Sequence, residues 1–513
     1  MQEGEHFDDY RTDTTYVVHY AAGICPQLMR FALMLQGVAL PDTGDQPFRY
    51  LELGYGFGLG TNIHAAAEGG DFWGTDFMAE HAVFASRLAE EAGTGAHLLN
   101  KSFAEMDAMS EAGELPQFDM ITFHGIWSWV NADNRRHMLN VVKRNLKPGG
   151  VVYNSYNALP GWSYFMPMRE IMVLNFERLG EDRSIEERVK ETIAYLQAMA
   201  ETNAAFFKQN PAAKIQLNSL LNMPPKYLAQ EYFNRSWDPF YFSEVAKTMA
   251  EADCAFVTST SLLSQTGALL PPDTRPILAN TRDRQFRETL RDFASNNRFR
   301  SDLFVRDAKY LNSRDQAAGV DALKLVPAME RDKIELHLDT NYGRVELNAE
   351  VYNALLDALH EGGYAPKTIG ALFSGPVLEK LDFNMRRECL CVLVGKNWAY
   401  PARDTVTPEA IAACRKLNRA LCEESVIKGN NMTAFASPVT GGGIGVSDIE
   451  QSLLYCRPQG EVVYEDWVRS VLDGLLRRNL KFDYEKAAKK LMAGMDTFVD
   501  KRLPFLEAMQ VVF

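Results

Sequence analysis

The sequence lacks any apolar run of the roughly 18 residues that a membrane-spanning helix requires. Its first residues, Met1-Gln2-Glu3-Gly4-Glu5, are acidic, and the apolar segment typical of a signal peptide does not follow them. We therefore expect no membrane insertion and a cytoplasmic location.

Basic charge is also scarce, since 54 Lys and Arg residues stand against 67 Asp and Glu residues and the net charge is −13. A general binder of nucleic acid or of anionic membranes needs a basic surface, so neither is expected as a partner. A basic protein substrate suits this charge better.

The seven cysteines show neither the spacing of a disulfide framework nor the His and Cys pairs of a zinc site. They are expected to be buried thiols in a reducing compartment, and no metal site is predicted. Cys389 and Cys391 lie two apart in an apolar run, which predicts a strand with both thiols on one face.

Glycines are concentrated behind one apolar run. Phe48–Leu53 is predicted to be a buried strand, and Gly54, Gly56 and Gly58 follow it where the chain must turn into a helix. Glycine permits positive φ and lets a ligand approach the backbone. Asp76 closes a second apolar run about 20 residues after the first glycine, where a carboxylate reaches the ribose hydroxyls of a nucleoside in a doubly wound fold.

This loop lacks the third glycine of a dinucleotide fingerprint. The pattern G-x-G-x-x-G counted from Gly54 places that glycine at position 59, which is Leu59. The glycines instead follow Glu52 at alternate positions, a register that resembles motif I of class I methyltransferases using S-adenosylmethionine (SAM). SAM is the predicted cofactor and S-adenosyl-L-homocysteine its product, with NAD as the alternative.

Strands and helices alternate from residue 48 to about 156, which predicts a parallel sheet that binds its ligand at the carboxyl ends of the strands. The predicted strands are Phe48–Leu53, Phe72–Asp76, Ala96–Leu99, Phe118–His124 and Gly150–Tyr156, joined after a helical block by Ala255–Ser259 and Phe299–Val305. The predicted helices include Ala79–Ala92, Asn134–Leu146, Met166–Leu179 and Glu186–Phe207. Lys147-Pro148-Gly149-Gly150 is predicted to stop a helix and turn the chain.

Two sequence blocks near the ends of the fourth and fifth strands are specific. They are His124-Gly125-Ile126-Trp127-Ser128-Trp129-Val130 and Ser155-Tyr156-Asn157-Ala158-Leu159-Pro160-Gly161-Trp162, with further blocks at Glu231-Tyr232-Phe233, Trp237–Phe242, Leu417–Leu421 and Ala436–Gly441. On these blocks nearly the whole chain resembles the bacterial SAM-dependent methyltransferases with a methyltransferase regulatory domain, and it is similar to rickettsial protein lysine methyltransferases. The resemblance implies a Rossmann-like domain, a helical dimerisation insert, and middle and C-terminal domains that help to dock the substrate.

We accordingly predict an α/β fold with a Rossmann-like, seven-stranded class I methyltransferase domain over 1–180 and 227–310, interrupted by a helical insertion over 181–226. A middle regulatory domain over 311–400 is predicted to be α+β and winged-helix-like, and the C-terminal domain over 401–513 mostly helical. In this half Ile334–Leu338 is a predicted strand, Ala349–His360 and Lys367–Phe373 are predicted helices, and the glycine-rich Pro438–Gly445 is a predicted loop.

The predicted cofactor site combines the glycine loop with the ends of the neighbouring strands. Its residues are Glu52, Gly54, Gly56, Gly58, Asp76, Phe77, Ser102, Phe103, His124 and Gly125. Asp76 is expected to bind the ribose hydroxyls, and Phe103 to form an apolar wall beside adenine or to pack in the core.

The predicted catalytic residues are His124, Trp127 and Tyr156. His124 could act as a general base, because histidine titrates near neutrality, or it could contact the cofactor through its backbone. Trp127 and Tyr156 could hold a methylammonium or a sulfonium by cation–π attraction, and core packing is the alternative. Candidate rim residues are Tyr16, Tyr20, Asn157 and Phe240–Phe242.

The predicted activity is SAM-dependent methyl transfer to a macromolecular acceptor, foremost the lysine side chains of a protein. The alternatives are N- or O-methylation of a small molecule or a surface glycan, and a SAM-binding sensor without catalysis. The multi-domain build favours a large substrate, and a homodimer is a further expectation.

Overall fold

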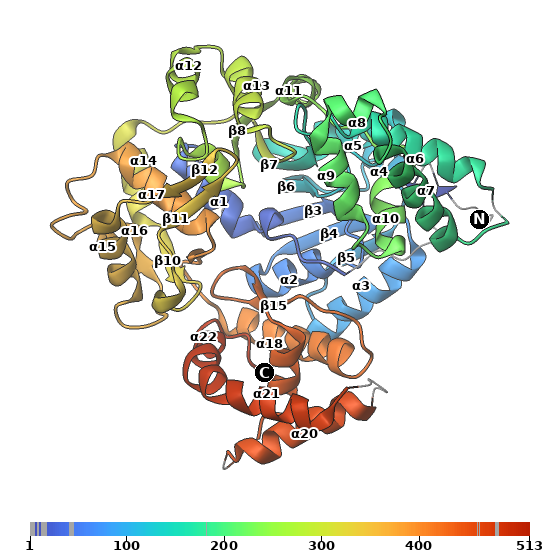
Figure 1. The fold of residues 1–513 in the computed structure, drawn as a ribbon. Coiled ribbons are helices and arrows are strands. Elements are labelled where there is room, and N and C mark those ends of the chain that lie inside the picture. Colours follow the sequence, from blue (N-terminus) through green and yellow to red (C-terminus); the bar gives the residue numbers. More distant parts are fainter. Residues whose placement is uncertain are drawn as a thin grey trace.

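A seven-stranded mixed sheet lies at the centre of the N-terminal half of the molecule (Figure 1). The computed structural model describes residues 6–7, 10–11, 18–39, 46–180, 182–458, 460, 462–477 and 482–513. In spatial order the strands are β5 (His97–Asn100), β4 (Asp71–Asp76), β3 (Arg49–Leu53), β6 (Phe118–Phe123), β7 (Leu146–Asn157), β9 (Phe299–Arg306) and β8 (Cys254–Ser259). The first five run parallel, and β9 runs antiparallel to both of its neighbours. The predicted Rossmann-like α/β fold is confirmed.

One strand departs from its predicted bounds. β7 begins at Leu146 and continues through Lys147-Pro148-Gly149-Gly150, which the sequence predicts as a helix stop and a turn. Phe118 and Met120 of β6 pair with residues 146 and 151, so the residues between them form a bulge and the strand resumes beyond it. The preceding helix, α5 (Ala132–Asn145), ends immediately before β7.

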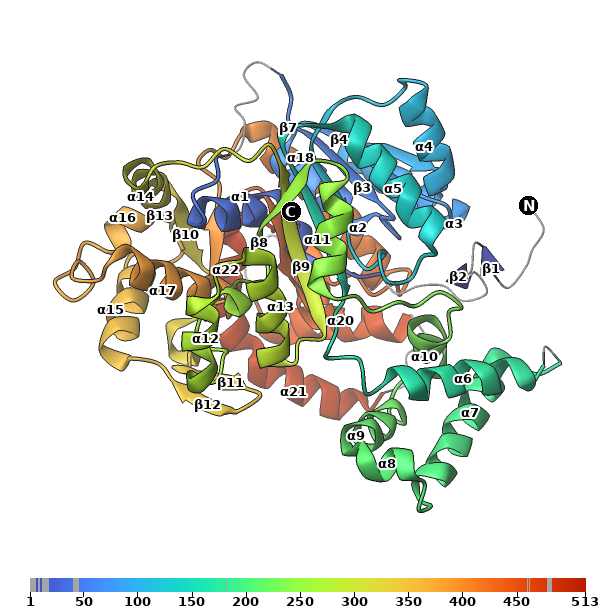
Figure 2. The same cartoon turned by 90° about the horizontal axis from the view of Figure 1, so that it is seen from above.

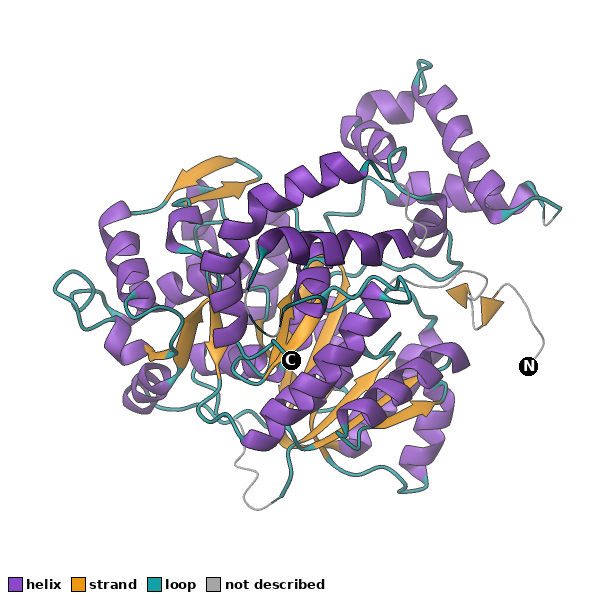
Figure 3. Cartoon of the chain, turned by 90° about the horizontal axis from the view of Figure 1, so that it is seen from below, coloured by secondary structure: helices purple, strands orange, loops and turns teal. Residues whose placement is uncertain are grey.

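Helices cover both faces of the sheet (Figure 3). One face packs against α4 (Phe103–Glu111), α5 and α11 (Phe242–Ala250), and the other against α1 (Pro26–Leu35), α2 (Leu59–Glu68) and α3 (Ala79–Ala92). Val152 belongs to the core of the first face, and Val151 and Tyr153 to that of the second. Successive residues of a strand point to opposite faces of the sheet. Odd- and even-numbered residues of β7 are therefore both buried, and the strand does not alternate between apolar and polar residues.

A helical bundle interrupts the sheet domain between β7 and β8 and projects from it (Figure 2). Its helices are α6 (Met166–Arg178), α7 (Ile185–Ala200), α8 (Ala205–Gln209), α9 (Pro211–Leu220) and α10 (Pro225–Tyr232). The core of the bundle extends from Phe165 to Trp237, so the predicted insertion over 181–226 lies inside a wider packed unit. The single helix predicted over Glu186–Phe207 is wrong, because α7 ends at Ala200 and a turn in which the Thr202 hydroxyl donates to the Met199 carbonyl (2.6 Å) precedes α8.

Residues 313–402 form an α+β region beside α1 (Figure 2). Its elements are α14 (Ser313–Ala322), β10 (Lys324–Pro327), β11 (His337–Thr340), β12 (Gly343–Glu346), α15 (Ala349–His360), β13 (Lys367–Thr368), α16 (Ile369–Leu372), α17 (Phe383–Gly395) and β14 (Ala399–Ala402). β10 pairs antiparallel with β13 and β14, and Leu325 and Leu390 share one core with Phe31 of α1 and Tyr153 of β7. The predicted α+β region is therefore present, and its core is continuous with one face of the sheet.

Three sequence predictions fail in this region. Cys389 and Cys391 lie on helix α17 and not on a strand, because a short apolar run fits a buried helix as well as a strand. The strand predicted over Ile334–Leu338 begins only at β11, and the helix predicted over Lys367–Phe373 begins with β13, after which Thr368 caps α16.

All seven cysteines lie in the described residues, none forms a disulfide, and all but Cys456 are buried.

The C-terminal region packs below α2 and α3 (Figure 1). It comprises α18 (Pro408–Val426), β15 (Ala434–Ser437), β16 (Gly442–Gly445), α19 (Asp448–Tyr455), α20 (Tyr464–Arg477), α21 (Tyr484–Thr497) and α22 (Leu503–Ala508). The loop predicted over Pro438–Gly445 is a β-hairpin, because β15 and β16 pair antiparallel around it. Among the helices that the structure describes, none combines the length and the hydropathy needed to cross a bilayer.

Candidate active site

The glycine loop joins β3 to α2 at the carboxyl edge of the sheet. Gly54, Gly56 and Gly58 have φ values of 80°, 57° and 68°, a conformation that disfavours any residue with a Cβ. A Cβ on Gly54 would lie 2.5 Å from the Ile126 side chain, and one on Gly58 would lie 2.5 Å from Ala85. A Cβ on Gly56 would meet no atom within 4 Å, so this residue borders open space.

Asp76 ends β4 and braces this loop. Its side-chain oxygens accept the backbone N–H groups of Gly56 (2.9 Å) and Met78 (3.0 Å), and His81 Nδ1 lies 3.0 Å from Oδ1. The residue is 8% exposed. The expectation that the carboxylate faces a ligand is therefore incomplete, because Asp76 also fixes the backbone beside which a ribose would lie.

Glu52 lies beneath the loop, inside β3. The Thr61 hydroxyl of α2 donates to its carboxylate at 2.6 Å, and burial raises the pKa of Glu52 to about 7 despite this hydrogen bond. A Cβ on Gly60 would come within 3.5 Å of the same carboxylate. Glu52 thus ties the end of the strand to the first turn of the helix and sets the shape of the loop.

The predicted adenine side lies across from Gly54. Ser102 caps α4 through a capping box with Glu105, so its hydroxyl is engaged by the helix terminus. The tip of the Phe103 ring would lie 3.6 Å from a Cβ on Gly54. The backbone carbonyl of Phe77, beyond Asp76, accepts a hydrogen bond from the Asn100 amide at 2.9 Å. These residues could form an apolar wall with hydrogen-bonding groups at its edge.

His124 and Gly125 follow β6. His124 Nδ1 lies 2.9 Å from the Tyr153 hydroxyl and 3.1 Å from the Ser155 hydroxyl, which also accepts the Gly125 N–H at 2.9 Å. Burial, helped by the charge of His19, lowers the pKa of His124 to about 4, so the imidazole is neutral near pH 7. Gly125 has a φ of 66°, and a Cβ there would meet no atom within 4 Å. Gly56 and Gly125 thus both border open space at the carboxyl edge.

The structure does not place Tyr156 and Trp127 at this edge. The Tyr156 hydroxyl donates to Asp302 at 2.7 Å on the face of the sheet opposite to His124. Trp127 is 2% exposed and stacks on Phe123 at 5.6 Å inside the core. These positions favour core packing, the alternative given for both side chains, because strand parity directs Tyr156 away from His124 and Trp127 lies in a turn over residues 127–129.

A cavity of about 500 Å³ opens beside His124. Its lining comes from the N-terminal segment (His19, Tyr20, Gly23, Cys25), from the sheet domain (Tyr153, Thr260, Ser301), from the middle region (Val394, Asn397, Tyr400) and from the C-terminal hairpin (Thr440, Gly442, Gly443). Within the described residues, the lining includes no Asp, Glu, Lys or Arg. Four parts of the chain therefore build one chamber whose described lining carries no Asp, Glu, Lys or Arg.

Tyr20 connects this chamber to α2, the helix that follows the glycine loop. Its hydroxyl accepts the Gly443 N–H at 2.8 Å and lies 3.1 Å from Nε2 of the buried His64 on α2. A Cβ on Gly443 would lie 2.7 Å from the Tyr20 ring, so the glycine-rich hairpin is needed for this close approach.

The predicted rim residues divide into three groups. Tyr20 lines the chamber, Asn157 and Phe242 are buried, and Tyr16 lies outside the described residues. Tyr153 and Ser155 were not predicted as site residues, although they lie two apart on β7 and therefore share the face toward His124. The one available signal was this spacing beside a strand-end histidine.

Comparisons with known proteins agree with this geometry. A family model described as "Methyltransferase domain" matches residues 51–150, and one described as "Predicted methyltransferase regulatory domain" matches residues 224–306. An uncharacterized protein of Synechocystis sp., sll1526, is 33% identical over 456 residues, which cover 88% of each chain. The chain belongs to the class I SAM-dependent methyltransferases with a methyltransferase regulatory domain. The predicted family, the methyltransferase activity and the SAM cofactor are thereby confirmed.

More distant proteins share parts or all of the methyltransferase's fold. The uncharacterized protein RP789 of Rickettsia prowazekii is 25% identical over 206 residues, or 38% of this chain and 35% of that one. The structure of PKMT2 from Rickettsia typhi in complex with AdoHcy superimposes with a TM-score of 0.66 at 17% identity, covering 94% of this methyltransferase and 98% of that chain. At this identity the likeness establishes the fold, including the regions on either side of the sheet domain.

The two tyrosines of β7 provide a matched test of the site. Tyr153→Phe removes a hydrogen bond to His124, and we expect kcat to fall about five- to tenfold, the value of one hydrogen bond of about 1 kcal/mol. Tyr156→Phe removes a buried hydrogen bond to Asp302 and is expected to lower the free energy of unfolding by about 1–3 kcal/mol with kcat preserved. Steady-state kinetics and urea unfolding of both variants check this, and a larger loss of kcat in Tyr156→Phe would contradict it.

Proposed function

We propose that the methyltransferase transfers the methyl group of SAM to lysine side chains of a protein acceptor. The observation that supports this proposal is the uncharged chamber beside His124, which four parts of the chain line together. A small acceptor requires only the sheet domain, whereas a wall supplied by the middle region and the C-terminal hairpin can also contact the chain around an acceptor side chain.

The residues at the carboxyl edge fit the cofactor. The positive-φ glycines and Asp76 would hold the methionine end and the ribose of SAM, and Phe77, Ser102 and Phe103 would surround its adenine. The open space beside Gly56 and Gly125 is the observation that supports this fit. When bound, SAM supplies a methyl group on a sulfonium, which is activated for in-line displacement without a metal or a nucleophilic side chain.

The chain then has to position a neutral amine. A lysine ammonium has an ordinary pKa near 10.4 and cannot attack until it loses a proton. A chamber lined by no carboxylate gives an ammonium no ion-pair partner and disfavours the charged form, so binding itself lowers the pKa of the acceptor amine. Alignment of donor and acceptor can contribute roughly 7–11 kcal/mol to the rate.

His124 is better suited to orient this amine than to deprotonate an ammonium. With a pKa of about 4 the imidazole is a weak base, and Nδ1 is already occupied by the Tyr153 and Ser155 hydroxyls. Among the described residues Nε2 has no hydrogen-bond partner, and in the tautomer whose Nδ1–H donates to these hydroxyls it accepts an N–H of the acceptor amine. Tyr153, whose pKa burial raises to about 12, keeps its proton at working pH and fixes the ring.

The direct experiment offers acceptors of different classes to the full chain with SAM. Lysine-containing bacterial surface proteins and peptides are compared with sugar nucleotides, and the products are examined by mass spectrometry. We expect methylated lysine in the protein samples, whereas transfer only to sugars would refute the proposal. A homodimer and a cytoplasmic location stay predictions.

The rate should depend on pH through the acceptor alone. We expect kcat/KM for a lysine peptide to rise from pH 7 to pH 9 by about tenfold per unit, because the fraction of neutral amine rises by that factor below a pKa near 10.4. His124, with a pKa of about 4, stays neutral over this range and therefore adds no further change of slope to the plot of rate against pH.

A series of initial rates at several pH values, with the His124→Asn variant as the control, checks this dependence. The variant should be about 10- to 100-fold slower with the same slope, since an orienting contact is lost and the titrating group is retained. If the wild-type profile instead levels off near pH 6 or 7, and the profile of the variant lacks this inflection, His124 is the general base.

A further inference from the structure

Helix α13 (Arg284–Ser295) buries its acids and exposes its aromatics. Glu288 and Asp292 are its buried residues, whereas Phe286 and Phe293 are 57% and 55% exposed. A surface helix ordinarily has the opposite arrangement, with apolar residues inside and charges outside. The helix belongs to the region matched by the regulatory-domain family model.

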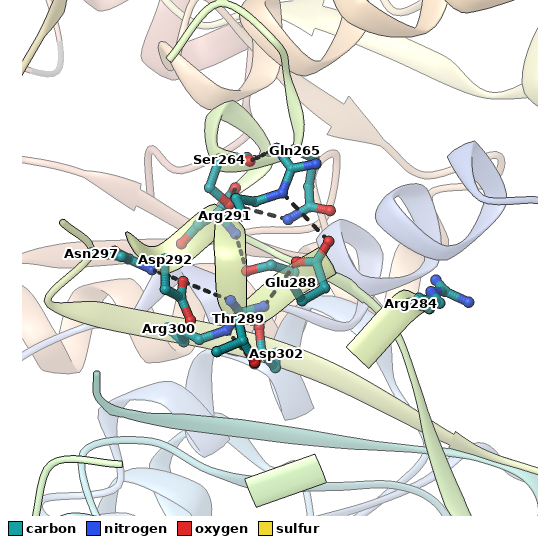
Figure 4. A network of polar contacts seen from close by, with 12 residues as sticks. Ser264, Gln265, Arg284, Glu288, Thr289, Arg291, Asp292, Asn297, Arg300 and Asp302 are labelled. Carbon is teal, nitrogen blue, oxygen red and sulfur yellow. Dashed lines mark hydrogen bonds and ion pairs between the residues drawn. The ribbon is translucent and has the colours of Figure 1, made fainter. Parts of the chain in front are cut away.

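A buried ion network fixes this orientation (Figure 4). Arg300 of β9 contacts Glu288 at 3.2 Å, Asp292 at 2.8 Å and Asp302 at 2.7 Å, and the Tyr156 hydroxyl donates to the same oxygen of Asp302, Oδ2, as Arg300 does. Breaking such contacts would leave charges unpaired in the interior, so α13 cannot rotate to bury its phenylalanines. Their exposure is therefore a stable property of the fold.

The exposed aromatics continue to the active site. Phe286, Leu290 and Phe293 lie at i, i+4 and i+7 and form one stripe along α13. The Phe293 ring lies parallel to the Tyr241 ring at 6.1 Å, and Phe299, 39% exposed, has its ring centroid 6.1 Å from that of His124. We call Phe286, Leu290, Phe293, Tyr241 and Phe299 the docking stripe.

Strand pairing and three hydrogen bonds hold the ends of the docking stripe together. Phe299 pairs with Asn157 across the sheet, and the Asn157 carbonyl accepts the N–H of Phe240, next to Tyr241, at 2.9 Å. Gly161 and Trp162 donate to the Asn297 and Arg298 carbonyls at 3.1 and 2.8 Å, which anchors the turn before Phe299. The docking stripe thus ends beside the imidazole that borders the acceptor chamber.

Arginine side chains lie near the docking stripe, although the protein as a whole is acidic. Arg282, Arg287 and Arg298 are neighbours of the stripe in the chain, and in the described part of the chain no carboxylate lies within ion-pair distance of any of them. Arg287 and Arg298 instead donate to the Thr281 carbonyl and the Gln216 amide oxygen, at 3.3 and 3.4 Å. The whole chain carries a net charge of −13, so this cluster of unpaired cations is local.

We propose that the docking stripe binds an apolar and acidic segment of the acceptor polypeptide, next to the lysine that is methylated. This inference rests on the proposed function and adds the sequence context that the site selects. Aromatic rings with nearby arginines are the residue types that dominate protein recognition, and the unpaired arginines complement acidic side chains. A second copy of this chain is the poorer occupant, because a two-fold contact between these stripes would bring arginines against arginines.

The test uses the full chain and three fluorescent peptides, each with one lysine. The first carries phenylalanines and glutamates on one side of the lysine, the second has serines in place of the phenylalanines, and the third has glutamines in place of the glutamates. Anisotropy with S-adenosylhomocysteine present measures affinity, and steady-state kinetics with SAM measures KM. We expect the first peptide to bind about tenfold more tightly than either of the others.

Two double variants assign the preference to the docking stripe. Phe286→Ser with Phe293→Ser should make the first and second peptides bind alike, and Arg282→Gln with Arg287→Gln should do so for the first and third. Val83→Ser, at a 71% exposed apolar position on α3, is the matched control and should keep the preference. Thermal melts monitored by circular dichroism verify that each variant is folded.

The possible outcomes separate the two proposals. The docking stripe is wrong if the three peptides bind with equal affinity, or if the preference survives in both double variants. The proposed function still holds in that case if lysine is methylated. Peptide selectivity that the variants abolish, without methyl transfer to lysine, upholds the docking stripe and refutes the proposed function. If the phenylalanine variant instead dissociates an oligomer in sedimentation and leaves peptide affinity unchanged, the stripe is a contact between copies and the proposal is wrong.

Discussion

A methyl side chain at position 56, introduced as Gly56→Ala, is expected to remove most of the affinity for SAM while the protein stays folded. The backbone there has a φ of 57°, so alanine is strained by about 1–2 kcal/mol, but its Cβ meets no protein atom within 4 Å. The methyl group would project into the open space proposed for the cofactor. Overpacking of about 1–3 kcal/mol corresponds to roughly a 10- to 100-fold loss of affinity, measured by calorimetry with SAM and with S-adenosylhomocysteine.

Gly93→Ala is a matched control for this effect. Gly93 ends α3 with a φ of 70°, and a Cβ there also meets no atom within 4 Å. Both variants should lose similar stability in urea unfolding, because both place alanine in the left-handed region. Only Gly56→Ala should lose cofactor affinity, and equal affinities in the two variants would remove Gly56 from the cofactor site.

The cofactor half of the site is predictable from sequence because its determinants are local. A strand, alternate glycines and an acid at the end of the next strand fix the path of the backbone over Gly54–Gly58, and the neighbouring parallel strand brings Asp76 to the loop. The same reasoning yields the sheet, since each strand carries its own apolar run. What it omits is the carboxylate's contact with the Gly56 N–H, which depends on the turn geometry.

The acceptor half is not predictable in this way. Tyr153 and Tyr156 look equivalent in the sequence. Both faces of β7 are buried, so the strand has no alternation of apolar and polar residues that would show which face each tyrosine lies on. Only the pairing of β7 with β6 and β9 decides that Tyr153 faces His124 and Tyr156 faces Asp302. Asn397 and Gly443 reach the chamber from regions far along the chain, and no local pattern reports such contacts.

The inverted helix illustrates a further limit. The pattern of α13 is strongly amphipathic, and the usual rule would bury Phe286 and Phe293. The structure reverses this orientation because Arg300, on β9, lies where Glu288 and Asp292 can pair with it inside the protein. A single charge from a distant strand therefore decides which face of the helix is buried. The apolar side chains stay exposed and form the docking stripe.

Arg300→Met is expected to cause the largest loss of stability. The variant leaves three carboxylates, on Glu288, Asp292 and Asp302, buried together without their cation. Breaking a buried ion pair costs about 3–5 kcal/mol, a large share of the 5–15 kcal/mol that stabilises a typical protein. Urea unfolding near neutral pH measures this loss, and methionine keeps much of the side-chain volume, so the effect reports charge rather than a cavity.

The loss should shrink as the pH falls. Burial raises the pKa of Asp292 to about 6 and raises the pKa of Asp302, with Arg300 opposing both shifts, so its removal lets them rise further. A folded-state pKa above the unfolded value of about 3.9 means that the native state keeps protons that the unfolded chain releases. Stability therefore increases as the pH falls through about 6 toward about 4, and the variant should be more stable near pH 5 than near pH 7.

Arg331→Met separates this network effect from the loss of any arginine. Arg331 pairs with the exposed Asp357 at 2.8 Å on the surface, and such pairs contribute about 0–1 kcal/mol. The control should lose little stability at either pH, since no carboxylate is left buried. If Arg300→Met resembles this control, or if its deficit does not diminish on acidification, the buried carboxylates do not depend on Arg300, and the orientation of α13 must have another cause.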